Sequence, residues 1–158
     1  MAKSDLLVML KPLGINMSQM ASRPLLLLRD DSGELTLPLP ISPLDAGVLM
    51  QQAGKAATMW SPHQVTVEIL KLAQLEPERC VFIEIRGGAV WGRLEFKNQK
   101  AIEMRADYLV SLCLYLNVPI FATADLIWRA RHQVFEIQEQ DGLMLFQSSA
   151  FRPHEYLM

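Results

Sequence analysis

Short apolar runs separated by turn signals fill the first third of the chain, a pattern typical of strands in a sheet. Three strands are expected, at 5–13, 24–29 and 34–39. A tight turn at 30–33 joins the last two. Pro38 and Pro40 end the third strand, because proline has no N–H to donate to a neighbouring strand.

Two helices are predicted from the same kind of start, a serine followed by a proline. The first begins at Ser42, carries Asp45 in its first turn and ends near Gly54. The second begins at Ser61, where Gln64 completes a capping box, and ends before the proline at 77. Helical spacing gives this second helix an apolar stripe, formed by Val65, Ile69, Leu72 and Ala73.

A three-stranded meander is predicted between residues 79 and 105, because Gly87 and Gly88 mark a two-residue hairpin turn. In this register apolar residues face one another: Ile85 and Val90, Ile83 and Gly92, Val81 and Leu94. A second turn, with a loop at 98–100, places Phe96 opposite Ile102 and Leu94 opposite Met104. On the other face it places Arg93 opposite Arg105, and Glu95 opposite Glu103.

An apolar helix at 107–116 follows, with Asp107 as its N-cap and Asn117 as a left-handed residue after its end. A strand at 118–122 and a short helix capped by Thr123 lead to a tail with a turn at 140–142. The fold class is therefore α+β, an antiparallel-rich sheet with two or three packed helices. A single domain (1–131) carries a C-terminal β-hairpin (132–151) and a short tail (152–158).

Composition fits a domain with a substantial core, since 51% of the 158 residues are apolar. The net charge of −2 gives no general attraction to nucleic acid or anionic membranes, and no membrane-spanning segment is expected. Cys80 and Cys113 form no paired motif and no signal peptide is recognised, so a cytoplasmic location is expected. Core packing is the favoured use of the nine methionines, and a soft protein interface is the alternative. Exposed strand edges favour a homo-oligomer.

Four segments, at 40–46, 61–65, 90–94 and 104–120, resemble runs of the bifunctional nuclease domain family of bacteria and plants. This similarity covers the chain from Leu6 to Arg131. It implies metal-assisted hydrolysis of DNA and RNA, with Mg²⁺ or another divalent cation as cofactor. Two acids of the family pattern are displaced. Gln64 replaces the acid after His63, and the acid expected at Tyr108 appears one residue earlier, as Asp107.

Arg93 and Arg105 are the first candidate site, because two guanidinium groups side by side can bind a phosphate. A ladder of ion pairs with Glu95 and Glu103 is the favoured alternative. Trp91 on the same face either stacks on a nucleic-acid base or anchors a protein interface.

His63 and Asp107 are the other catalytic candidates, the first as a neutral base and the second as a base or metal ligand. A structural histidine and a helix cap are the favoured readings. Glu84, Glu95 and Glu103 share the outer face and offer oxygen ligands for Mg²⁺, although the arginines between them make a poor cluster. Two functions stay open: a metal-dependent nuclease, or a non-catalytic binding or assembly protein with the same fold.

Overall fold

The described part of the chain in this computed structural model comprises residues 6–17, 23–53, 61–133 and 143–146. Its elements, in chain order, are β1 (Leu7–Asn16), β2 (Leu25–Arg29), β3 (Thr36–Pro40), α1 (Pro43–Ala53), α2 (His63–Leu72), β4 (Pro77–Arg86), β5 (Ala89–Phe96), β6 (Ala101–Arg105), α3 (Ala106–Tyr115), β7 (Ile120–Thr123), α4 (Ala124–Gln133) and β8 (Leu143–Leu145).

One sheet runs through the molecule in the order β3-β2-β1-β7-β4-β5-β6, with β8 also paired to β1. The β4–β7 pair is parallel and the other pairs are antiparallel. Helices α1, α3 and α4 pack on the sheet or on one another. The α+β class, the antiparallel-rich sheet and the packed helices are therefore confirmed.

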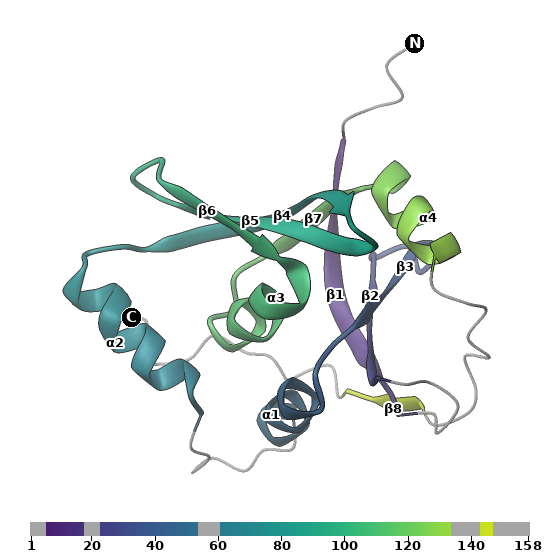
Figure 1. Cartoon of the computed structure of the whole chain (residues 1–158), viewed down its shortest axis with the longest axis horizontal. Helices are drawn as coiled ribbons and strands as arrows, with labels where there is room; N and C mark the ends of the chain where they lie inside the picture. The colour runs from purple at the N-terminus through teal and green to yellow at the C-terminus, as the bar shows by residue number, and fades with distance from the viewer. Residues whose placement is uncertain (1–5, 18–22, 54–60, 134–142, 147–158) are drawn as a thin grey trace.

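The long strand β1 connects the two halves of the sheet. Its first residues pair with β7, whereas Lys11 to Asn16 pair with β2. A bulge between Pro12 and Gly14 lies just after this change of partner. Because a bulge bends its strand, β1 carries the chain from one half to the other, and the two halves run in different directions in Figure 1.

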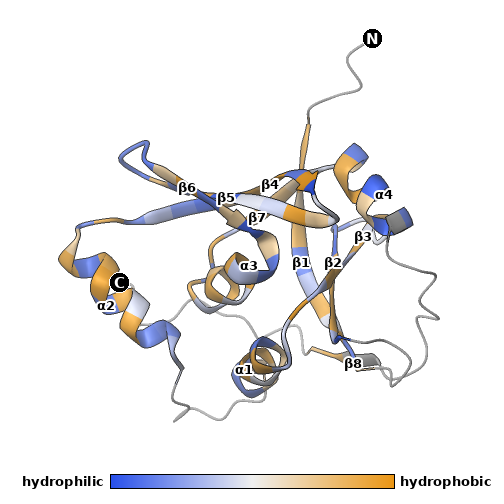
Figure 2. Ribbon diagram, in the orientation of Figure 1, coloured by the Kyte–Doolittle hydropathy of each residue, from blue (hydrophilic) through white to orange (hydrophobic). Residues whose placement is uncertain are grey.

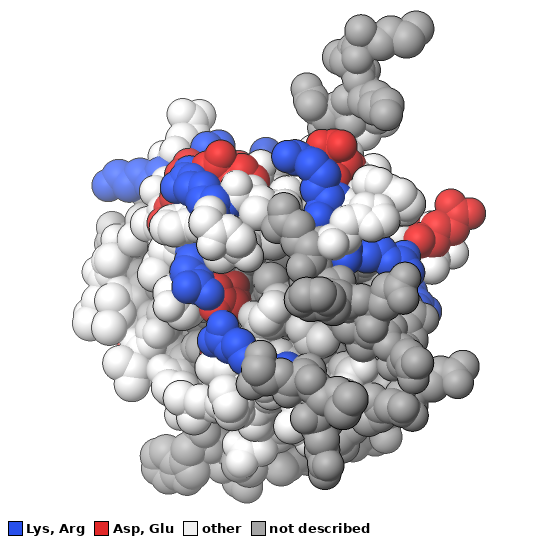
Figure 3. Space-filling view, turned by 45° about the vertical axis from the view of Figure 1, so that its right-hand side comes forward, with Lys and Arg blue, Asp and Glu red and all other residues white. Residues whose placement is uncertain are grey.

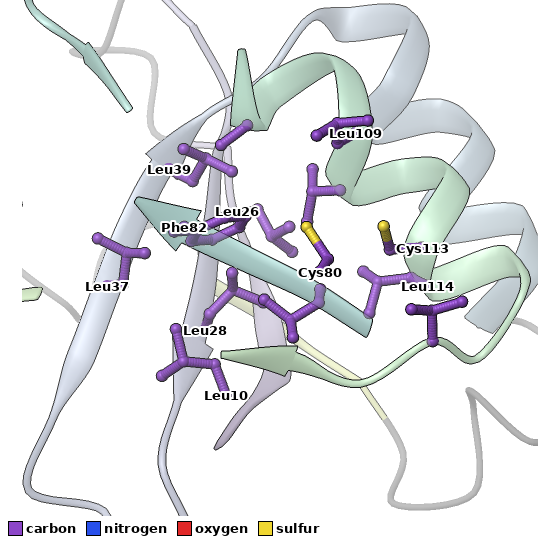
Figure 4. Close-up of a cluster of buried hydrophobic side chains, with 14 of the residues drawn as sticks. Leu10, Leu26, Leu28, Leu37, Leu39, Cys80, Phe82, Leu109, Cys113 and Leu114 are labelled. Carbon is purple, nitrogen blue, oxygen red and sulfur yellow. The ribbon is translucent and has the colours of Figure 1, made fainter. Parts of the chain in front are cut away.

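Helix α3 occupies the space enclosed by the two halves of the sheet and is buried on nearly all sides. Figure 4 shows Leu109, Cys113 and Leu114 of α3 beside leucines of β2 and β3 and beside Cys80 and Phe82 of β4. Gly92 of β5 permits this approach, since an added Cβ would lie 3.2 Å from side-chain carbons of Leu109 and Phe82. The core therefore depends on a small residue in the middle of the meander.

Local signals place three of the helix ends as expected, whereas Pro62, and not Ser61, is the N-cap of α2. Ser42 Oγ accepts a hydrogen bond from the Asp45 N–H at 3.0 Å and donates one to the Asp45 carboxylate at 2.8 Å. Thr123 Oγ1 accepts a bond from the Leu126 N–H at the start of α4. Asn117 adopts a left-handed φ of 53° after α3. These three sites confirm the caps predicted from residue type alone.

The first hairpin of the meander has the predicted turn but only part of the predicted register. Ile85 lies opposite Val90, as expected. A bulge between Phe82 and Glu84 then shifts the pairing by one residue, so Phe82, not Ile83, lies opposite Gly92. In the same way Cys80 replaces Val81 opposite Leu94. The shift directs the thiol and the phenyl ring into the core beside α3.

The second hairpin has a different loop from the one predicted. The Phe96 N–H donates to the Lys100 carbonyl at 2.8 Å, and Gln99 takes a left-handed φ of 68°, so the loop is 97–99. Because the loop lies one residue earlier than predicted, each residue of β5 faces a β6 residue two positions earlier than predicted. The predicted opposition of Arg93 and Arg105 is wrong, as are the other pairings of that hairpin. The observed pairs place Arg93 opposite Glu103, Arg105 opposite Trp91, Glu95 opposite Ala101, Leu94 opposite Ile102 and Gly92 opposite Met104.

Helix α2 turns its predicted apolar stripe to solvent instead of to the core. Val65 is 64% exposed, Ile69 58% and Leu72 86%, while Val67 is the buried residue of this helix. Figure 2 shows apolar positions recurring along α2, which lies at the periphery of the molecule. The spacing identified a helix correctly but did not identify its buried side.

The described methionines do not fill the core as expected. Met9, Met17 and Met104 are 40% to 42% exposed, and Met50 is half-buried.

In the tail, β8 pairs with β1, with Leu145 opposite Gly14. The turn of the predicted C-terminal hairpin, at 140–142, lies outside the described residues.

Candidate functional site

The outer face of the β4–β5–β6 meander holds most of the predicted site residues. Strand alternation turns the side chains of Trp91, Arg93 and Glu95 away from α3, together with those of Glu103 and Arg105. On β4, Arg79 pairs with Glu95, Glu84 pairs with Trp91, and Arg86 pairs with Ala89 beside the turn. Figure 3 shows basic and acidic side chains next to one another on the face in view, so the charge there is mixed.

Arg93 is part of a ladder of ion pairs on this face. Its Nη2 lies 2.9 Å from Glu103 Oε1, and Arg86 Nη2 lies 3.2 Å from Glu103 Oε2. Hydrogen bonds from Arg93 and then Arg86 hold the pKa of Glu103 below its ordinary value. Beside them, Arg79 Nε donates to Glu95 Oε2 at 2.7 Å. The ladder, and not a pair of adjacent arginines, is the arrangement found.

Arg105 is held by Asp107 in a two-point contact. Arg105 Nε lies 3.0 Å from Asp107 Oδ1, and Nη2 lies 3.1 Å from Oδ2. The hydrogen bonds and the charge of Asp107 raise the pKa of the Arg105 guanidinium. Its Cζ also lies 5.1 Å above the centre of the Tyr108 ring. The Arg105 guanidinium thus contacts Asp107 and Tyr108 in the first turn of α3.

Asp107 is not the N-cap of α3, so this prediction is wrong. Strand β6 runs directly into α3, and Arg105 occupies the cap position without a side-chain cap bond. Asp107 follows in the first turn, 5% exposed, with its carboxylate directed to Arg105. A buried carboxylate is stable there because it has a bidentate cationic partner and lies near the positive end of the helix dipole.

Trp91 lies half-buried on the outer face, between Glu84 and Arg105 in the pairing. The Arg86 guanidinium lies 4.7 Å from the centre of the indole ring. This cation–π contact occupies one face of the ring. An incoming base would have to displace Arg86 or use the other face.

His63 belongs to a different place, at the junction of α1, α2 and α3. Its Nε2 lies 2.7 Å from Ser111 Oγ, and its ring centre lies 5.5 Å from that of Tyr115. Burial lowers the pKa of His63, and the negative charge of Asp45 opposes this effect. Ser111 is fully buried in α3, so the pair attaches α2 to the core.

The structure therefore brings Arg93, Arg105 and Asp107 near the outer face but leaves His63 with α3, which packs on the other face. Ser111 and its contact with His63 were not found from the sequence. The available signal was a hydroxyl side chain in an otherwise apolar helix, which predicts a buried polar contact.

The described residues contain no group of three or more His, Cys, Asp or Glu side chains placed to hold a metal ion. Glu95 and Glu103, the predicted metal ligands, each accept hydrogen bonds from an arginine. Across those same residues, every helix is too short or too polar to cross a membrane.

A further feature of this region is the free edge of β6. Within the described strands β6 is last in the sheet order, with β5 on one side. Two apolar side chains on its inner face remain accessible: Ile102 is 44% exposed and Met104 40%. An apolar edge strand can accept another strand through its main chain.

Helix α2 lies on the same side of the sheet as α3, below the meander in Figure 1. Glu76, just after α2, forms an ion pair with Lys97 in the β5–β6 turn, which keeps the end of α2 near this hairpin.

Comparison of the chain with protein-family models and with curated proteins gave no match.

Proposed function

We propose that this protein is a non-catalytic assembly domain that associates with further copies of itself in the cytoplasm. The observation that carries the proposal is the apolar surface left open on two elements. These are the β6 edge, with Ile102 and Met104, and the outward row of α2, with Val65, Ile69 and Leu72. Each element exposes large apolar side chains, and exposed apolar patches are typical of contact sites between proteins.

The outer face of the meander supports catalysis less well. Arg93 and Arg105 already have acidic partners at hydrogen-bond distance, and Glu103 is shared by two arginines. A phosphate would therefore have to compete with carboxylates that are part of the same chain. His63 contacts Ser111 instead of these residues. The buried, free thiols of Cys80 and Cys113 support a reducing compartment.

The first test measures the mass of the protein in solution by analytical ultracentrifugation over a range of concentrations. We expect a concentration-dependent oligomer that Ile69→Lys weakens, because a charge placed in an apolar contact loses its hydration. Gln64→Lys adds the same charge on the same helix at an exposed polar position and is expected to leave the mass unchanged. A wild-type chain that stays monomeric at high concentration would contradict the proposal.

The second test addresses the nuclease predicted from the family resemblance. Single-stranded DNA and RNA are incubated with the protein and Mg²⁺, or with EDTA. We expect no cleavage that depends on the protein. Metal-dependent cleavage that disappears in the Arg105→Ala, Asp107→Ala double variant would replace the assembly proposal with an enzymatic one. Removing both partners avoids leaving a buried charge unpaired, so this variant is expected to fold.

A further inference from the structure

The free edge of β6 has a defined set of outward backbone groups. The Phe96 N–H donates to the Lys100 carbonyl, which makes these two residues a hydrogen-bonded pair of the β5–β6 hairpin. Such pairs recur at every second residue, so the backbone groups of Ile102 and Met104 point to β5. Those of Glu103 point the other way, to the edge where no described strand is paired.

The side chains along this edge alternate in character. On the inner face lie Ile102 and Met104, both apolar and partly exposed. On the outer face lie Glu103 and Arg105, which carry opposite charges two residues apart. A strand with this pattern is complementary to itself when it runs antiparallel, because each acid can then face a base.

We infer that the partner on this edge is a second copy of the chain, with the two β6 strands antiparallel about a twofold axis beside Met104. The inference rests on the proposed function and adds the contact strand and its register. Glu103 of each copy then lies opposite Arg105 of the other, and the two Met104 side chains meet on the inner face. Because β6 ends at Arg105, residues 103–105 of each copy form this pairing, which joins the sheets of the two copies.

Charge selects this axis over the neighbouring one. An axis beside Glu103 would place the two Glu103 carboxylates directly opposite each other, and like charges facing across a strand pair destabilise it. With the axis at Met104, the acid of each copy faces a guanidinium. Glu103 already accepts hydrogen bonds from Arg93 and Arg86, and Arg105 donates to Asp107. Side-chain exposures of 39% for Glu103 and 36% for Arg105 leave their remaining lone pairs and N–H groups accessible to a second strand.

Disulfide trapping tests the axis with variants that each add one cysteine to the chain. Met104 would form a non-hydrogen-bonded pair with its own copy, with Cα atoms about 4.5 Å apart, which suits a disulfide. Under mild copper–phenanthroline oxidation we expect Met104→Cys to form a covalent dimer. Ile102→Cys is the control on the same face, two residues from the axis, and at least tenfold less dimer is expected. Cys80 and Cys113 are fully buried, and the wild-type chain measures their background.

A second pair of variants tests the charges. Glu103→Lys would face Arg105 of the other copy with a like charge, and we expect at least a tenfold weaker dimer in ultracentrifugation. Glu95→Lys makes the same change of charge on the same sheet face, one strand further from the edge, and is expected to leave the dimer unchanged.

The outcomes separate this inference from the proposed function. Equal trapping of both cysteine variants, or no trapping while the wild-type chain is oligomeric, would overturn the β6 axis and leave self-assembly standing. Equal weakening by the two lysine variants would overturn the charge register. A monomeric wild-type chain would overturn both proposals.

Discussion

Helices α2 and α3 have the same length, ten residues, and both are rich in apolar side chains, yet they occupy opposite environments. α3 is enclosed by the sheet, and even its polar residues Asp107 and Ser111 are buried. α2 buries Val67 and leaves Ile69 and Leu72 in solvent. The difference shows that spacing and end signals predict that a segment is helical, whereas the place of the helix in the sheet topology decides what it covers.

The two helices are linked by a small number of polar contacts. His63 of α2 reaches Ser111 of α3, and its ring lies beside that of Tyr115. At the other end, Arg105 and Asp107 connect the start of α3 to the edge strand. We therefore expect the effect on stability to decrease from the core around α3, to the start of α3 at Arg105, to the contact of His63 with Ser111.

The largest expected difference between the helices is in the cost of removing an apolar side chain. Leu109→Ala in α3 should lower the free energy of unfolding by about 3 kcal/mol, because it leaves a cavity in a closed core. At concentrations where the chain is monomeric, Ile69→Ala in α2 should change it by less than about 0.5 kcal/mol, as at other surface positions. Urea denaturation of the two variants measures both values. Similar losses would show that α2 is packed in solution.

The next effect is at the start of α3. Arg105→Ala should destabilise the fold by about 2 kcal/mol, because Asp107 stays buried without its partner, while the partial exposure of Arg105 moderates the loss. Arg93→Ala removes an arginine from the exposed ladder and should cost much less. Denaturation midpoints compare the two variants. Equal midpoints would mean that, in Arg105→Ala, water or another donor hydrogen-bonds to the Asp107 carboxylate.

The smallest effect is a dependence of stability on pH. Burial holds the pKa of His63 below 6.5, the ordinary value that the unfolded chain should show. Below pH 6.5 the unfolded chain therefore binds a proton that the folded chain does not, and stability falls as the pH decreases. The wild-type chain should lose more stability than His63→Gln between pH 7 and 5, as measured by thermal unfolding. Parallel curves for the two proteins would exclude this role of His63.

Residue types alone were enough to predict the features that depend on a few neighbouring residues. Ser42, Thr123 and Asn117 define helix ends through contacts within one or two turns, and these positions were predicted correctly. The alternation of apolar and polar residues likewise predicted the α+β class and the three strands of the meander. Local chemistry is sufficient there because the interacting groups are close along the chain.

The tertiary structure decided which residues meet. A one-residue difference in the 97–99 loop moved Arg93 from Arg105 to Glu103, and nothing in the local residue types distinguished the two loops. The bulge after Phe82 followed from packing against α3, and the contact of His63 with Ser111 joins residues 48 positions apart. Register and contacts between distant elements are set by how the whole core fills, so a short stretch of sequence does not specify them.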